Sequence, residues 1–504
     1  MIPLTVAQIA DIVGGELSGI SRADAEQTRV TGTVEFDSRA VADGGLFLAL
    51  PGARTDGHDF APAAVAAGAV AVLAARPVGV PAIVVPPAEN PDNSSGALEH
   101  DADGSGAAVL AALGRLAAAV AAELTAGKLR IIGVTGSSGK TSTKDLLAAV
   151  LAPLGQVIAP PGSFNNELGH PWTVLRATAD TDFLILEMSA RHPGNIAALA
   201  AIATPSIGVV LNVGTAHLGE FGSREVIAAT KSELPQSVPA SGVVVLNADD
   251  PAVAAMADVT AARVVRVSRA AGADVWAGPV TLDEVARPRF TLHAGNQEVD
   301  IALAVHGEHQ VSNALAAAAV ALECGATLAQ VADTLAGAAP VSARRMQVST
   351  RADGVTVIND AYNANPDSMA AGLKALAWMA RSASERRRSW AVLGEMAELG
   401  DDAITEHDRI GRLVVRLDVS RLIVVGAGRT MRAMHQGAVM EGSWGSESVL
   451  VPDADAALEL LRAELADGDV VLVKASNSAG LGALADALAA DGQQRGDTGT
   501  GPEA

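Results

Sequence analysis

Short continuous runs of apolar residues recur along the chain, separated by polar turns and by alanine-rich segments with helical periodicity. The central part carries such runs at 130–136, 183–187, 207–212 and 242–247, and the part after Pro340 carries them at 355–360, 390–396, 421–428 and 469–476. Runs of this length are typical of strands buried on both faces of a parallel sheet. Their alternation with helical segments predicts an α/β fold.

Breaks in this pattern predict three domains, which suits a chain of 504 residues. We expect an N-terminal domain at 1–106, a central domain at 107–338 that opens with a helix over 107–126, a C-terminal domain at 339–490 and a flexible tail at 491–504. Residues 86–106 hold five acidic residues, no Lys or Arg, and many Pro, Gly and Ser. This composition predicts a loose, disordered insertion.

Composition narrows the classes of function. The chain has 36 Lys and Arg against 57 Asp and Glu, a net charge of −21, which argues against a nucleic-acid-binding protein. Cys324 is the single cysteine, so a disulfide within the chain is excluded and a reducing cytoplasm is expected. The first residues lack the pattern of a signal peptide. The apolar stretches are broken before about 18 residues, so no membrane span is expected.

A phosphate-binding motif lies between a predicted strand and a predicted helix. It reads Gly136-Ser137-Ser138-Gly139-Lys140-Thr141. Glycines let the backbone approach a phosphate, and the helix N-terminus directs N–H groups at it. Lys140 can neutralise phosphate oxygens and Thr141 can ligate Mg²⁺. Val134 replaces the first glycine of the usual motif, so a simple glycine-rich turn is the alternative.

Two further residues follow predicted strands near this loop. Glu187 ends the run 183–187 and His217 comes soon after 207–212. Ligands of open α/β sheets bind beyond the carboxyl ends of the strands, so both residues are candidate Mg²⁺ ligands. Mg²⁺ prefers oxygen, which weakens the case for His217, and a capping or surface role is the alternative for each. Lys231, judged by its spacing alone, is an ordinary surface lysine of a helix.

Taken together, these motifs resemble the Mur ligase family, the ATP-dependent amide-bond ligases of peptidoglycan precursor synthesis. The resemblance rests on segments 135–142, 163–175, 187–191, 216–223, 307–317, 359–369 and 394–400. Segments 37–39 and 44–60 resemble the family's UDP-sugar-binding domain. The string 362–369 is the most specific, and it resembles the members that add D-alanyl-D-alanine to UDP-N-acetylmuramoyl-tripeptide.

The resemblance implies a three-domain α/β architecture: a UDP-substrate-binding domain, a P-loop ATPase-like parallel-sheet domain and a Rossmann-like C-terminal domain. It implies catalytic roles for Lys140, Lys231 and His217. The implied ATP-binding residues are Gly136, Ser137, Ser138, Gly139, Lys140, Thr141, Ser142, Asn313, Arg345 and Asp360. The implied substrate-binding residues are Ser38, Arg39, Asp56, Gly57, His58, Ser163, Phe164, Asn165, Asn166, Tyr362, Asn363 and Asn365. The implied Mg²⁺ ligands are Thr141, Glu187, His217 and Lys231, the last as a carbamate formed with CO₂.

The implied reaction is phosphorylation of the tripeptide carboxylate by ATP, followed by attack of the dipeptide amino group on the acyl phosphate. A cytoplasmic monomer is expected. The alternatives are another Mur ligase, a folylpolyglutamate-synthase-like ligase or, from another class, a P-loop regulatory ATPase. Segment 474–480 lacks an Arg that relatives usually carry. Adjacent Arg344 leaves the Arg345 assignment open by one residue, and Asp367 is either a base or a helix cap.

Overall fold

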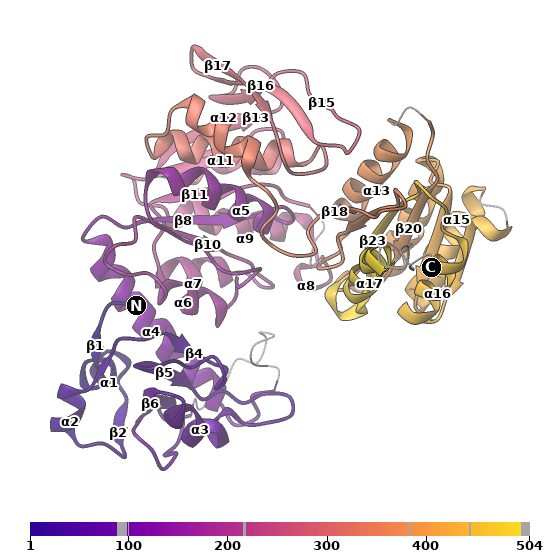
Figure 1. Cartoon of the computed structure of the whole chain (residues 1–504). Helices are drawn as coiled ribbons and strands as arrows, with labels where there is room; N and C mark the ends of the chain where they lie inside the picture. Colours follow the sequence, from indigo (N-terminus) through magenta and orange to yellow (C-terminus); the bar gives the residue numbers. More distant parts are fainter. Residues whose placement is uncertain (88–97, 99, 215–217, 383–384, 443–444, 495–504) are drawn as a thin grey trace, which may run out of the picture.

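The computed structural model describes residues 1–87, 98, 100–214, 218–382, 385–442 and 445–494, and these form three α/β bodies (Figure 1). The predicted fold class is confirmed, and every apolar run named above contains a strand. In Figure 1 the N-terminal body lies below the central one and the C-terminal body lies beside it. The described residues therefore place one cleft between the central and C-terminal bodies.

The N-terminal body is built on a five-stranded sheet in the order β2-β7-β6-β5-β4. Its strands are parallel except β2, and β1 pairs with β3 apart from this sheet. The elements are β1 Leu4–Thr5, α1 Val6–Val13, β2 Glu16–Ser18, α2 Arg22–Gln27, β3 Arg29–Val30, β4 Val34–Glu35, β5 Gly45–Leu48, a 3₁₀ helix Gly57–Phe60, α3 Ala61–Ala66, β6 Ala69–Ala74 and β7 Ala82–Val84.

The central body is built on a ten-stranded sheet, in which β9, β10, β8, β11, β12, β13 and β14 are parallel neighbours. Antiparallel β15, β16 and β17 extend one edge. The strands are β8 Arg130–Thr135, β9 Val157–Ile158, β10 Phe183–Glu187, β11 Ile207–Val210, β12 Val243–Asn247, β13 Arg263–Ser268, β14 Val275–Ala277, β15 Thr281–Leu282, β16 Pro288–Ala294 and β17 Gln297–Ala302. The helices are α4 Ser105–Thr125, α5 Lys140–Leu151, α6 Gly169–Val174, α7 Asn195–Ile202, α8 Leu218–Phe221, α9 Arg224–Ser237, α10 Pro251–Ala254, α11 Gln310–Glu323 and α12 Leu328–Gly337.

The C-terminal body has a six-stranded sheet in the order β18-β19-β23-β20-β21-β22, parallel except for β18. Its strands are β18 Gln347–Thr350, β19 Thr356–Asn359, β20 Ser389–Leu393, β21 Arg421–Val425, β22 Ser448–Val451 and β23 Val470–Lys474. Its helices are α13 Pro366–Arg381, α14 Ala403–Arg416, α15 Arg429–Glu441, α16 Ala454–Glu464 and α17 Leu481–Gln494. Buried apolar residues of α13 and α14 cover one face of the sheet, and those of α16 and α17 cover the other.

Register within the central sheet decides where the site lies. β8 has β10 on one side and β11 on the other, all parallel, and Glu187 is the register partner of Val134. The loops that follow Thr135, Glu187 and Val210 therefore leave the sheet at the same edge. This is the edge that faces the C-terminal body (Figure 1).

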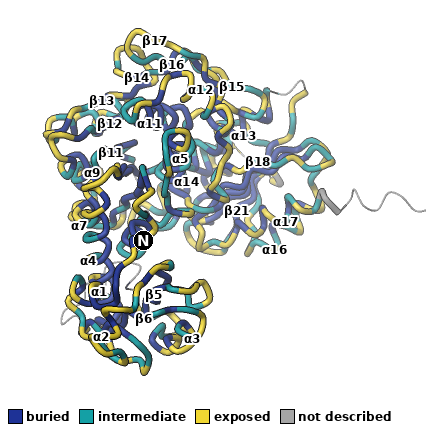
Figure 2. The backbone as a smooth tube through the Cα atoms, turned by 60° about the vertical axis from the view of Figure 1, so that its left-hand side comes forward, coloured by how far each residue is buried: buried dark blue, intermediate teal, exposed yellow. Residues whose placement is uncertain are grey.

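Helix α4 bears on the expectation that the chain has no membrane span. It spans 21 residues and is long and apolar enough, by length and composition, to cross a membrane, although Arg115 and Glu123 interrupt its apolar residues. Its Leu113, Leu116 and Val120 are buried, and it contacts α1, α6 and α7. Figure 2 shows α4 running between the N-terminal and central bodies. These contacts identify a core helix that joins two domains.

The C-terminal end of segment 86–106 is folded, which corrects the prediction of a loose insertion for this part. Residues 88–97 and 99 lie outside the described residues. Asp101 is 2% exposed and accepts hydrogen bonds from the backbone N–H groups of Gly106 (2.9 Å) and Ala107 (2.8 Å) in the first turn of α4. The structure likewise extends α17 to Gln494, inside the expected tail; residues 495–504 lie outside the described part.

We expect Asp101→Ala to destabilise the protein by about 1–2 kcal/mol, because two N–H groups at a helix start would lose their acceptor. Thermal unfolding of the purified protein measures the effect. Glu123→Ala, an exposed position on the same helix, is the matched control and should leave the melting temperature unchanged. Equal melting temperatures for the two variants would contradict the capping role.

Candidate active site

The predicted phosphate loop joins β8 to α5, as the sequence indicated. Gly139 has φ 83°, and a Cβ there would lie 2.6 Å from Oδ1 of Asn313, so a glycine is required. Lys140 donates to the Gly136 carbonyl at 2.6 Å, and Asn212 accepts from the Ser138 N–H at 2.9 Å. Lys140 thus helps to hold the backbone of its own loop in place. The loop lines a cavity of about 710 Å³, together with Ser142 and Asn313.

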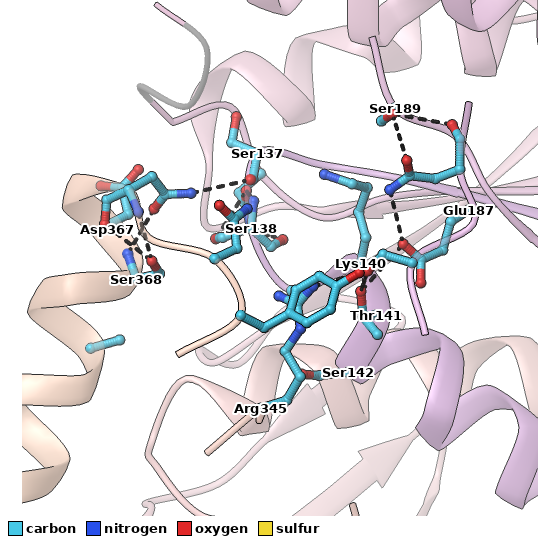
Figure 3. A pocket seen from close by; sticks show the side chains of 18 of the residues that line it. Ser137, Ser138, Lys140, Thr141, Ser142, Glu187, Ser189, Arg345, Asp367 and Ser368 are labelled. Atoms are coloured by element: carbon cyan, nitrogen blue, oxygen red, sulfur yellow. Dashed lines mark hydrogen bonds between the residues drawn. The ribbon is translucent and has the colours of Figure 1, made fainter. Parts of the chain in front are cut away.

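Glu187 lies at the end of β10, is fully buried, and faces the start of α5 (Figure 3). Its Oε2 accepts from Oγ1 of Thr141 (3.3 Å) and from Nδ2 of Asn165 (3.4 Å). Its Oε1 is buried and has no hydrogen-bond partner in the described part of the chain. Burial raises the pKa of the Glu187 carboxyl, and the positive charge of Lys140 opposes this shift. An unsatisfied carboxylate oxygen beside a threonine hydroxyl fits a divalent cation, the group that the sequence implied here.

Lys231 is buried in α9, only 5% exposed, so its reading as a surface lysine is wrong. Burial lowers the pKa of its amine well below the usual value, and the charge of nearby Lys140 lowers it further. Lys231 does not line the cavity, but Lys140 does. His217 lies outside the described residues. Within the residues that are described, no group of three or more His, Cys, Asp or Glu side chains could hold a metal ion.

Arg345 resolves the choice between the two neighbouring arginines. Its guanidinium lies 4.3 Å from the ring centroid of Tyr362 and donates to Oγ of Ser163 at 2.9 Å, so it spans the cleft from the C-terminal side. Arg344 instead forms an ion pair with Asp486. The arginine that lines the cavity is therefore Arg345.

The segment after β19 differs in part from the expectation. Asp360 lines the cavity, but its carboxylate is bonded to Lys474 and to the Met346 N–H. Asn365, not Asp367, is the N-cap of α13: its Oδ1 accepts from the Ser368 N–H at 2.9 Å. The helix-cap reading of Asp367 is wrong for this reason. Asn363 is exposed and lines the cavity.

The substrate-binding candidates in the central and N-terminal bodies lie in different places. Ser163, Asn165 and Asn166 line the cavity. Phe164 instead packs against Phe36 and Trp172 at the junction with the N-terminal body.

The five N-terminal candidates, Ser38, Arg39, Asp56, Gly57 and His58, do not line this cavity. His58 is 3% exposed and lies 2.6 Å from Asp56, while its other ring nitrogen accepts from the Ala75 N–H. Gly57 lies where a Cβ would approach the Leu50 backbone to 2.6 Å. His58 and Gly57 thus have structural roles in this body, whereas Arg39 is exposed and bonded to Asp37.

Several cavity-lining residues were not among the candidate site residues, although five of them lie in segments 187–191, 307–317 and 394–400, which carry the family resemblance. They are Ser189, Arg191, His192, Asn195, Arg269, His309, Gln310 and Glu398. Arg191 donates to Glu398 at 2.8 Å, so it links the central and C-terminal bodies across the cleft. Ser189 and Arg191 directly follow the strand that carries Glu187, and this position was the signal available in the sequence.

Comparison with known families agrees with this arrangement. Residues 134–321 match the Mur ligase middle domain, residues 344–477 match the Mur ligase, glutamate ligase domain, and residues 32–120 match the Mur ligase family, catalytic domain. The chain belongs to the Mur ligase family. The cavity thus lies between two recognised domains of a Mur ligase.

The similarity to known relatives extends over nearly the whole chain. UDP-N-acetylmuramoyl-tripeptide--D-alanyl-D-alanine ligase of Mycobacterium tuberculosis (strain H37Rv) is 74% identical over 97% of this chain and 98% of its own length. The Escherichia coli (strain K12) enzyme of the same name is 33% identical over 98% of this chain and 100% of its own. The crystal structure of MurF from Acinetobacter baumannii superposes with a TM-score of 0.80 at 29% identity, covering 97% of this chain and 99% of that one. MurF from Thermotoga maritima, solved in complex with ADP, gives 0.73 at 26% identity, covering 92% and 99%.

Proposed function

We propose that this Mur ligase joins D-alanyl-D-alanine to UDP-N-acetylmuramoyl-tripeptide at the expense of ATP, a step of peptidoglycan synthesis. The observation that carries the proposal is the 74% identity, over nearly the full length, to the mycobacterial enzyme of that name. The cleft supports it, because a phosphate loop, a buried carboxylate and residues of the C-terminal domain line one cavity. An enzyme that brings together three substrates needs such a junction.

At the nucleotide end, the backbone N–H groups of the loop and the start of α5 would hold the ATP phosphates. Glu187 and Thr141, with His217 and a carbamate formed by CO₂ on Lys231, would hold Mg²⁺. When bound, Mg²⁺ neutralises phosphate oxygens and so assists attack by an anion. A buried amine that stays neutral, as the lowered pKa of Lys231 indicates, is the form that reacts with CO₂.

In the proposed reaction, two anions must approach each other: the substrate carboxylate and the γ-phosphate of ATP. Lys140 supplies a positive charge at the transferring phosphate, and Arg345 approaches the same region from the C-terminal body. Contacts across the cleft, such as that of Arg345 with Ser163, would keep this body over the loop and help to exclude water. Exclusion of water protects an acyl phosphate until the amino group of the dipeptide attacks it.

At the dipeptide end, the structure separates two asparagines that the sequence treated together. Asn363 is exposed in the cleft, whereas the side chain of Asn365 caps α13. We expect Asn363→Ala to raise the KM for D-alanyl-D-alanine by ~5- to 150-fold with little change in melting temperature, because one polar contact is lost. Asn365→Ala should instead destabilise the protein by about 1 kcal/mol. Separate KM values for the three substrates, together with melting curves, check both predictions. An Asn363→Ala variant with an unchanged KM for D-alanyl-D-alanine would contradict the assignment of Asn363.

The deciding experiment measures phosphate release with each UDP-tripeptide, carrying lysine or diaminopimelate, with and without D-alanyl-D-alanine. Release that requires both a UDP-tripeptide and the dipeptide supports the proposal. ATP turnover without either would indicate a regulatory ATPase. Turnover with a UDP-linked acceptor and a single amino acid would indicate another Mur ligase.

We further propose that the enzyme acts in the cytoplasm as a monomer. ATP and nucleotide-linked substrates are found there, and the single Cys324 fits a reducing compartment. Light scattering during gel filtration, at working concentrations, tests the oligomeric state.

A further inference from the structure

A buried ion pair forms part of the cavity wall on the side of the C-terminal domain. Lys474, the last residue of β23, is 2% exposed, and its Nζ donates to Oδ2 of Asp360 at 2.5 Å. The same Nζ donates to the backbone carbonyl of Asn363 at 3.1 Å. Buried charges of this kind are costly unless they are paired, and a hydrophobic pair of similar volume is often as stable. The position of the pair therefore suggests a task besides stability.

The second oxygen of Asp360 holds the segment that carries Arg345. Its Oδ1 accepts from the Met346 N–H at 3.0 Å. Arg344 has φ 59° and Met346 has φ 50°, so the backbone on both sides of Arg345 is in the left-handed region. Residues other than glycine persist in this region only where their surroundings hold them. The hydrogen bond from Asp360 is one such constraint, and it sets the direction in which Arg345 crosses to Ser163.

We infer that Asp360 and Lys474 are positioning residues that fix Arg345, at the nucleotide end of the cleft, relative to Asn363, at the dipeptide end. The inference rests on the proposed function for the identity of the two ends. It replaces the expectation that Asp360 itself contacts the nucleotide. One carboxylate and one ammonium thereby connect the linker before β18, the loop after β19 and the end of β23.

The test compares Lys474→Met, Asp360→Asn and the double variant. Each single variant breaks the ion pair that joins the two segments and leaves one buried group without its partner. We expect the KM values for ATP and for D-alanyl-D-alanine to rise together by about 10-fold or more, while the KM for the UDP-tripeptide changes less than about twofold. In the double variant both charges are absent, so the melting temperature should return toward that of the wild type while the two KM values stay high.

A matched control lies at the opposite end of the same strand. Asp469 precedes β23, is 2% exposed, and pairs with Arg388 away from the cleft. Arg388→Met should lower the melting temperature without changing the ratio among the three KM values. This control separates loss of positioning from loss of stability.

Three results would overturn the inference. The first is an equal rise in all three KM values that follows the melting temperature, as in the Arg388 control. The second is recovery of the KM values together with stability in the double variant. The third is a rise in the ATP KM for Asp360→Asn while Lys474→Met has no effect, which would make Asp360 a direct nucleotide ligand. Failure of the wild-type enzyme to use D-alanyl-D-alanine would instead refute the proposed function, and it is measured first.

Discussion

Replacement of Lys140 by alanine is expected to lower the turnover number at least ~100-fold, about 3 kcal/mol of transition-state stabilisation. Lys140 supplies positive charge where a phosphoryl group would move between two anionic oxygens. Its present hydrogen bond to the Gly136 carbonyl shows that the ammonium is already held over the loop. Burial lowers the pKa of this amine, and the nearby Glu187 carboxylate opposes the shift.

The measurement is phosphate release at saturating substrates, with Lys128→Ala as the matched control. Lys128 is exposed, pairs with Asp182 and does not line the cavity, so its loss should leave turnover unchanged. Binding of the UDP-tripeptide should also survive in Lys140→Ala, because the loss concerns phosphate. A Lys140 variant that keeps more than half of the wild-type turnover would refute the phosphate-loop assignment.

The sequence predicted the central sheet and the edge that carries the phosphate loop and Glu187. Both depend on local patterns of residues. Apolar runs predicted the strands, and the rule that parallel strands end together brought the phosphate loop and Glu187 to one edge. The cap of α13 could also have been predicted from the sequence. Pro366 occupies the first helical position, and proline there favours a cap at the residue before it, which is Asn365. Asp367 also has a side chain that can cap a helix, but it lies two residues after Asn365, where the cap forms.

Other features depend on contacts between distant segments, and no local pattern carries them. Lys231 sits in a helix of mixed composition, and only packing of α9 against the central sheet buries it. The pairing of Asp360 with Lys474 joins residues 114 positions apart. Asp101 lies in an acidic, glycine-rich stretch whose composition predicts disorder, yet its side chain caps the helix that links two domains.

Loss of Lys231 is expected to have an effect of similar size to loss of Lys140. An ammonium group beside Lys140 would repel it, whereas a carbamate would carry negative charge and oxygen ligands for Mg²⁺. The lowered pKa keeps the amine neutral to lower pH than for an ordinary lysine, so CO₂ can react near neutrality. Lys231→Ala should therefore lower turnover by about 100-fold or more, since a charge that stabilises the transition state is removed.

Chemical rescue separates a carbamate from a structural lysine. Acetate or formate added to Lys231→Ala should restore part of the activity, because a small carboxylate can fill the space of the missing carbamate. Lys144→Ala is the control: Lys144 is also buried in this domain but donates to the Pro160 carbonyl and pairs with Asp145, so carboxylates should not rescue it. Carbon-13 NMR of the wild-type enzyme in labelled bicarbonate should show a carbamate signal that is absent from Lys231→Ala. A bare amine in wild type, together with an active alanine variant, would rule out the carbamate and leave Glu187 and Thr141 as the described candidates for holding Mg²⁺.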